Sequence, residues 1–209
     1  MKIVLMLIYF LSFQFLIAQQ LDDHLVPENS IFNDFNFQFE YYSKVRNKLF
    51  NGLSDMPTIR YHRMPSFSGE NVMDIYEVSD STYEIAYHEC EKFIWYNPDE
   101  KVVIYKFRKP ISKSEVVLLK QLFQAAIDDT RYPKEREQGF DGTTYRFGYR
   151  AYGLRTGKIW SPRKGTNLYE LVRISNEIIE RVKVVKYEVL ITDKMENDIV
   201  ILTNKLLSK

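Results

Sequence analysis

The sequence predicts an α+β protein in which helices pack on one face of an antiparallel meander sheet. Residues 58–109 alternate with a period of two and are broken by short turn sequences. Segments beginning near residues 112 and 167 repeat apolar residues with helical spacing. The connections between the predicted strands are too short for the crossovers that parallel strands need. Helices on one face of an antiparallel sheet follow from this order.

The first 18 residues are typical of a secretory signal peptide. Lys2 supplies a positive charge, residues 3–17 form an apolar run interrupted only by Ser12 and Gln14, and Ala18 is a small residue suited to cleavage. The run is shorter than the ~20 apolar residues of a membrane-spanning helix. We expect export to the periplasm or the extracellular medium, with no stable membrane span in the mature chain. An uncleaved N-terminal anchor is the alternative.

Residues 19–30 are predicted to be a flexible leader, and residues 31–209 a single α+β domain without a linker or repeat. A helix is predicted within residues 31–53, with Asp34 as its N-cap and Gly52 beyond its end. The aromatic and apolar residues near helical spacing are Phe32, Phe35, Phe39, Tyr42 and Leu49. Phe35, Phe37 and Phe39 also alternate as they would in a strand.

The meander is predicted from β-branched and aromatic segments separated by turn residues. Turns are expected at residues 79–81 and 97–100, and Pro110 is expected to end the block. The predicted strands are residues 58–63, 72–78, 82–90, 92–96 and 101–108.

A second helix is predicted from Ser112, which forms a capping-box pattern with Glu115, to about Asp128. Residues 131–133 stop it, and the charged residues 134–139 are predicted to form a loop. Its apolar face contains Val116, Leu119, Phe123, Ala126 and Ile127.

Asp141 and Gly142 form a turn before a predicted strand at residues 143–152, and a second turn at residues 153–157 leads to residues 158–160. On the first strand, Tyr145, Phe147 and Tyr149 alternate with Arg146, Gly148 and Arg150. Because alternate side chains point to opposite faces, we expect a buried aromatic side and an exposed basic side.

The strongest amphipathic helix is predicted to begin at Asn167, with Glu170 completing a second capping-box pattern. Residues 185–191 either form a strand or prolong this helix. A last helix is predicted from a cap at Asp193 and Glu196, with Met195, Ile199, Leu202 and Leu206 on one face.

Composition excludes several classes of protein. Among 209 residues, 29 Lys and Arg oppose 28 Asp and Glu, so the formal net charge is +1 and no whole-protein field attracts nucleic acid. One cysteine excludes an intramolecular disulfide and a thiolate zinc cage. Cys90 is expected to be buried in a strand.

No catalytic site, cofactor site or metal site is predicted. The chain lacks a nucleophile elbow, a P-loop and an HExxH helix. His88 and Cys90 share a strand face. His62 or a residue of another strand would have to join them to bind a metal, and His62 would have to meet Cys90 across the meander to activate the thiol. A hydrolase would need converging carboxylates, for which the candidates are Asp128, Asp129, Asp141 and Glu170.

The one marked charge asymmetry lies between Asp141 and Glu170, where the chain has no acid. Arginine forks bind carboxylate or phosphate, and Trp and Arg are frequent in binding hot spots. The simpler alternative to a binding surface is that the basic face of the strand is exposed to solvent and balanced by nearby acids. The candidate binding residues are Arg146, Arg150, Arg155, Lys158, Trp160, Arg163 and Lys164.

The sequence therefore favours an exported, non-catalytic binding module for a protein or an anionic envelope polymer, and it argues against nucleic acid as the partner. Two alternatives remain. A hydrolase of an envelope polymer requires a polar cleft with carboxylates of raised pKa. A structural or assembly component of the envelope requires a large exposed apolar patch.

Overall fold

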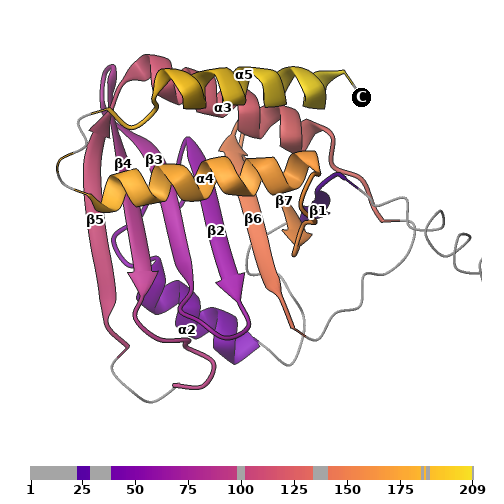
Figure 1. Ribbon diagram of the computed structural model, residues 1–209. Helices are drawn as coiled ribbons and strands as arrows, with labels where there is room; N and C mark the ends of the chain where they lie inside the picture. The colour runs from indigo at the N-terminus through magenta and orange to yellow at the C-terminus, as the bar shows by residue number, and fades with distance from the viewer. Residues whose placement is uncertain are drawn as a thin grey trace, which may run out of the picture.

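The computed structural model of the chain (Figure 1) describes residues 23–28, 39–97, 102–133, 141–184, 186 and 189–208. The predicted signal segment and the predicted loop at residues 134–139 lie outside the described residues, as does Asp34.

The described strands form one antiparallel sheet in the order β1-β7-β6-β2-β3-β4-β5. Strands β2 to β5 form the predicted meander, and β6 and β7 form the predicted hairpin, so the α+β fold class is confirmed. The strands are β1 Val26–Glu28, β2 Ile59–Pro65, β3 Asn71–Ser79, β4 Thr82–Cys90, β5 Ile104–Ile111, β6 Thr143–Arg150 and β7 Leu154–Trp160.

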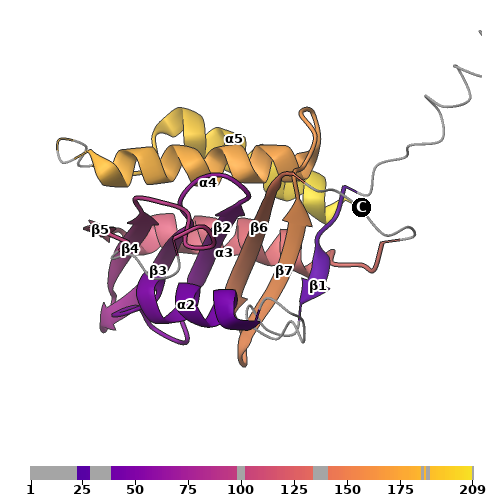
Figure 2. The same ribbon diagram turned by 90° about the horizontal axis from the view of Figure 1, so that it is seen from below.

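Three helices cover one face of the sheet: α3 Lys113–Asp128, α4 Asn167–Lys183 and α5 Asp193–Leu207. The helix α2 Phe39–Leu49 lies on the opposite face (Figure 2). The predicted helical covering is thus confirmed for the first face, and the second face carries a helix of its own. The predicted N-terminal helix is confirmed over residues 39–49, and Gly52 follows it with a φ of 89°.

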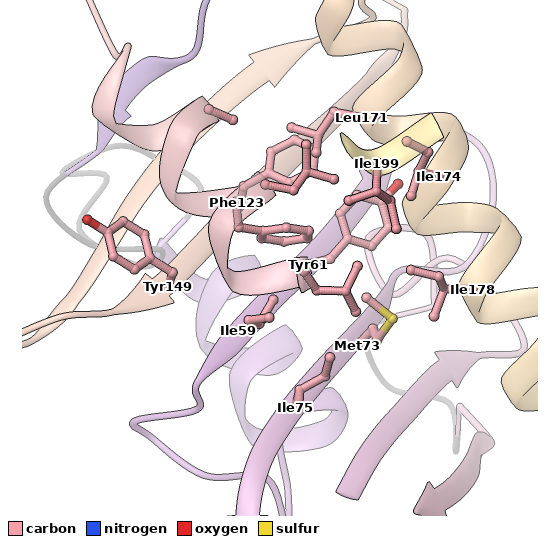
Figure 3. Close-up of a cluster of buried hydrophobic side chains, with 14 of the residues drawn as sticks. Ile59, Tyr61, Met73, Ile75, Phe123, Tyr149, Leu171, Ile174, Ile178 and Ile199 are labelled. Carbon is pink, nitrogen blue, oxygen red and sulfur yellow. The ribbon is translucent and has the colours of Figure 1, made fainter. Parts of the chain in front are cut away.

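The larger core lies between the sheet and helices α3, α4 and α5. Figure 3 shows its centre, where Tyr61 of β2 and Phe123 of α3 lie beside side chains from β3 and α4. The apolar alternation of the strands supplies one side of this core, and the helical repeats supply the other. The predicted apolar face of α5 is confirmed, since Met195, Ile199, Leu202 and Leu206 are its buried residues.

The helix caps agree with the sequence prediction at α3 and differ by one residue at α4 and α5. Ser112 and Glu115 form the predicted capping box. At the other two helices the N-caps are Thr166 and Thr192, whose hydroxyl groups accept from the backbone N–H three residues later. Each threonine hydroxyl gives an acceptor to an N–H group of the first turn that has no partner within the helix.

Several segments differ from the predicted strands and turns. Residues 92–96 form a turn rather than a strand, because Ile94 is buried toward α2 and its carbonyl accepts from Asn97 N at 3.2 Å. Pro110 lies inside β5, where proline is tolerated because β5 is the outer strand. Described residues between α4 and α5 are neither helix nor strand.

Gly157 lies inside β7 rather than in the predicted turn at residues 153–157. A Cβ atom at this position would stand 3.0 Å from the Cβ of Leu25 and 2.9 Å from Cγ2 of Thr130. The glycine therefore marks a close approach of two chain segments, which the sequence does not distinguish from a turn glycine.

Residues 23–28 are part of the fold rather than of a flexible leader. Strand β1 pairs with β7, Leu25 is fully buried, and the carbonyl of Leu25 accepts from Arg131 N at 2.9 Å. The carboxylate of Asp23 accepts from the N–H groups of residues 167 and 168 at 3.0 Å, at the N-terminus of α4. These long-range contacts have no local sequence signal, which explains why the prediction was wrong here.

Leu25→Ala should lower the free energy of unfolding by about 2–5 kcal/mol, because it removes a fully buried side chain and leaves a cavity. Urea denaturation measures this change. His24→Gln, at the adjacent half-buried position, is the control and should change it by less than about 1 kcal/mol. Equal stabilities for the parent and Leu25→Ala would show that this segment is a leader after all.

Candidate functional site

The sheet face beneath α2 buries charged and polar side chains beside a small apolar cluster that includes Val45 and Leu49 of α2 and Val72 of β3. We call the charged and polar set the polar layer. The exposed fraction is 5% for Arg60, 2% for Arg146, and 0% for His62, Glu70, Asp74 and His88. The side chain of Glu28 is 5% exposed and completes the set. Buried charges are costly unless they are paired, so the partners of each group decide what the layer does.

Arg60 and Asp74 form the first ion pair of the polar layer, across β2 and β3. Nε and Nη2 of Arg60 donate to the two carboxylate oxygens of Asp74 at 2.7 and 2.5 Å. Nη2 also donates to the carbonyl of Ser54 at 2.6 Å, and the ring of Phe50 lies 4.7 Å from the guanidinium carbon. Burial raises the pKa of Asp74 although Arg60 opposes the rise. Because both members are buried, removal of either one would leave the other as an uncompensated charge.

Arg146 and Glu28 form the second ion pair, which joins β6 to β1. Nε of Arg146 donates to the Glu28 carboxylate at 3.1 Å, and Nζ of Lys158 lies 3.3 Å from the same carboxylate. The ring of Tyr42, on α2, lies 5.5 Å from the Arg146 guanidinium carbon. Burial opposes the charge of Arg146, but Glu28 and Tyr42 outweigh it and raise its pKa.

Glu70 joins α2 to the loops at one end of the sheet. Its carboxylate accepts from the hydroxyl of Tyr41 at 2.7 Å and from the backbone N–H of Ile94 at 3.2 Å. Burial raises the pKa of Glu70, and the bond from Tyr41 opposes this rise. Burial, with Glu70 nearby, also raises the pKa of the Cys90 thiol. A protonated, buried thiol is a poor nucleophile, and the predicted burial of Cys90 is confirmed.

The two histidines of the polar layer lie beneath the C-terminal end of α2. His62 packs edge-on against the ring of Phe50, with centroids 5.1 Å apart, and neither ring nitrogen has a hydrogen-bond partner among the described residues. Nδ1 of His88 donates to the carbonyl of Leu49 at 2.7 Å. In the described part of the chain, no three His, Cys, Asp or Glu side chains gather to hold a metal ion.

The structure separates the basic residues that the sequence singled out. Arg146 lies opposite the aromatic side of β6, as predicted, but it is buried under α2 rather than exposed, because Glu28 neutralises it. Arg155 lies on the α3 side, where it donates to Asp128 and to the hydroxyl of Tyr149.

The remaining predicted residues lie nearer the surface. Arg150 is 4.0 Å from the carboxylate of Glu77, and Lys158 contacts Glu28. Trp160 is half-buried at the end of β7, beside Gly142, and Arg163 and Lys164 are exposed in the loop before α4. The side chains of Arg150 and Arg155 are also 42% and 50% exposed, but each of them faces an acid of the same chain, Glu77 and Asp128 respectively.

A group of exposed and half-buried aromatic rings lies on α2 and the β4–β5 connection, and we call it the aromatic cluster. The exposed fraction is 40% for Trp95 and 66% for Tyr96. The centroid of the Tyr41 ring lies 5.2 Å from that of Trp95, and the rings of Phe93 and Tyr96 are also 5.2 Å apart. The cluster comprises Tyr41, Tyr42, Phe93, Trp95 and Tyr96.

One feature of the sequence indicates this cluster, and the prediction of a strand at residues 92–96 did not take it into account. Residues 93–96 are four consecutive apolar residues followed by Asn97 and Pro98, which is a turn sequence rather than an alternating strand. Two of the four, Trp95 and Tyr96, point outward.

Three of the four carboxylates considered for a hydrolase, all except Asp141, have separate partners. Asp128 contacts Arg155, Asp129 contacts Arg131, and Glu170 contacts Arg173. A shallow hollow between the N-terminal ends of α3 and α5 is lined by Glu115 and Glu196, and Glu115 accepts there from the backbone N–H of Ile191. No described helix is both long enough and apolar enough to cross a membrane.

Asp74→Asn should lower the free energy of unfolding by about 3–5 kcal/mol, because it leaves the buried charge of Arg60 without its counter-charge. Asp128→Asn removes a partner of Arg155 at the surface and should cost less than about 1 kcal/mol. Denaturant titration of both variants measures the difference. Similar losses would show that Arg60 is solvated rather than enclosed.

Comparisons of this chain with protein-family models, with curated proteins and with solved structures found no match.

Proposed function

We propose that this chain is an exported, non-catalytic binding module whose contact surface is the aromatic cluster. The observation that carries the proposal is the support beneath Trp95 and Tyr96. These rings are exposed, yet Tyr41 packs against Trp95 and is itself held by its bond to the buried Glu70. Ring contacts of this kind fix the rings before a partner arrives, which reduces the entropy lost on binding.

The partner that fits this surface best is an anionic polymer with flat ring faces, such as an acidic glycan of the envelope. Aromatic faces offer apolar area to sugar rings. Helix α2, which carries Tyr41 and Tyr42, also carries Lys44, Arg46 and Lys48 against a single acid of its own, Glu40, which pairs with Lys44 at 2.9 Å. Positive charge near an aromatic platform favours an anionic partner. Export, as proposed from the signal segment, favours an envelope polymer over nucleic acid.

Residues 142–169, which contain no acid, support this function less than we expected from the sequence. Arg146, Arg155 and Lys158 contact acids of the same chain. A partner would have to displace these acids, and for Arg146 it would also have to open the polar layer. Arg163 and Lys164 are the residues of this stretch that the proposal retains as a secondary contact.

Trp95→Ala combined with Tyr96→Ala should weaken binding to immobilised polygalacturonate by about tenfold or more, since central aromatic side chains dominate binding free energy. Equilibrium binding at two salt concentrations measures both the loss and the electrostatic part. Neutral dextran should bind more weakly than polygalacturonate.

Tyr152→Ala is the matched control, because Tyr152 is fully exposed in the β6–β7 turn at the other end of the sheet. Arg163→Gln with Lys164→Gln tests the secondary contact and should weaken binding by no more than about threefold. Equal losses for Tyr152→Ala and the Trp95/Tyr96 variant, or a parent protein that does not bind, would contradict the proposed surface.

A further inference from the structure

His62 is enclosed by cations and apolar groups. Its antiparallel partner on β6 is Arg146, and its partner on β3 is Val72. Along β2, the residues on the same face are Arg60 and Met64. Phe50, which follows α2, closes the site from above. Both ring nitrogens are buried and have no partner among the described residues.

The acids near His62 are already engaged by the arginines. Asp74 of β3 pairs with Arg60, and Glu28 of β1 pairs with Arg146 and Lys158. Tyr42, from α2, packs on Arg146. A proton on His62 would therefore add a third positive charge between two fixed ones, with two N–H donors and no acceptor for them in the described part of the chain.

His88 lies beneath the same end of α2. Its ring is joined to the helix by the bond from Nδ1 to the carbonyl of Leu49. Its partner on β5 is Lys106, and Arg108 lies two residues further along that strand. Glu84 pairs with Arg108, and Cys90, on the same face of β4, lies near Glu70. The charges that act on the His88 ring are therefore those of Lys106 and Arg108 on the neighbouring strand, and both oppose a proton on it.

We infer that α2 is an acid-released cover, held on the sheet while His62 and His88 are neutral and freed when they take up protons. In the closed arrangement the described residues offer no acceptor to a protonated His62, whereas a detached α2 admits water to both rings. The inference does not depend on the proposed function, because it concerns the attachment of α2 alone.

The direction of the pH dependence follows from the two rings. Burial, reinforced by Arg146 and Arg60, lowers the pKa of His62 well below its ordinary 6.5. Burial also lowers the pKa of His88, with Lys106 and Arg108 acting in the same direction against the bond to Leu49. A lowered pKa means that the open form binds protons first. Closure is therefore stable above about pH 6.5 and weakens as the pH falls below it.

The experiment is hydrogen–deuterium exchange of the purified protein at pH 7.5 and 5.5, corrected for intrinsic exchange rates. Opening of α2 should increase by about tenfold for each histidine that titrates. Amides of α5, on the opposite face, should keep their protection and serve as the internal control. Equal protection of α2 at the two pH values would overturn the inference, as would an equal increase in exchange in α5.

Variants of the three histidines show which of them causes the pH-dependent opening of α2. His62→Leu and His88→Gln should each reduce the increase in α2 exchange between pH 7.5 and pH 5.5 by a factor of about ten. The glutamine of His88→Gln keeps a donor for the carbonyl of Leu49. His24→Gln should leave the increase unchanged, since His24 lies beside Leu25 near β1. A full increase in both His62→Leu and His88→Gln, or its loss in His24→Gln, would contradict the assignment.

Release of α2 would also remove Tyr41 from beneath Trp95, so binding by the aromatic cluster should weaken at pH 5.5. This consequence rests on the proposed function, whereas the exchange measurement does not. Exchange that responds to pH in a protein that does not bind polygalacturonate would refute the binding proposal and leave the acid-released cover standing.

Discussion

The constraint on which the rest of the structure depends is charge neutrality on the buried face of the sheet beneath α2. Arg60 and Arg146 point into this face from two adjacent strands. Each requires an acid in a fixed position, because a buried, unpaired charge costs several kcal/mol. Asp74 comes from the neighbouring strand, but Glu28 must come from β1, which this requirement ties to the edge of the sheet.

This constraint also decides which surfaces are left for a partner. The cations that make residues 142–169 conspicuous in the sequence are largely engaged by acids of the same chain. Trp95 and Tyr96 of the aromatic cluster, in contrast, remain exposed. The polar layer holds α2 through Glu70 and Tyr41, and the same tyrosine supports Trp95 at the surface. A buried polar group thus positions an exposed apolar one.

The sequence predicted elements that depend on local pattern and missed those that depend on distant contacts. The capping box at Ser112 and the apolar face of α5 need only residues within one helix. Burial of Arg146 depends on Glu28, which lies 118 residues earlier. Alternation assigns a charged residue to the solvent side, because it cannot recognise a counter-charge brought by another strand. The turn containing Trp95 was missed because four apolar residues resemble a strand.

The central claim is that Arg146 is buried as the partner of Glu28 and is not available to a binding partner. A double-mutant cycle with Glu28→Gln and Arg146→Met tests this claim most directly. If the two side chains form a buried pair, the free energies of unfolding should show a coupling of about 1–3 kcal/mol. Additive effects, with a coupling near zero, would mean that Arg146 does not depend on Glu28. In that case Arg146 would be available to a partner, and the contact surface would have to be sought again on β6 and β7.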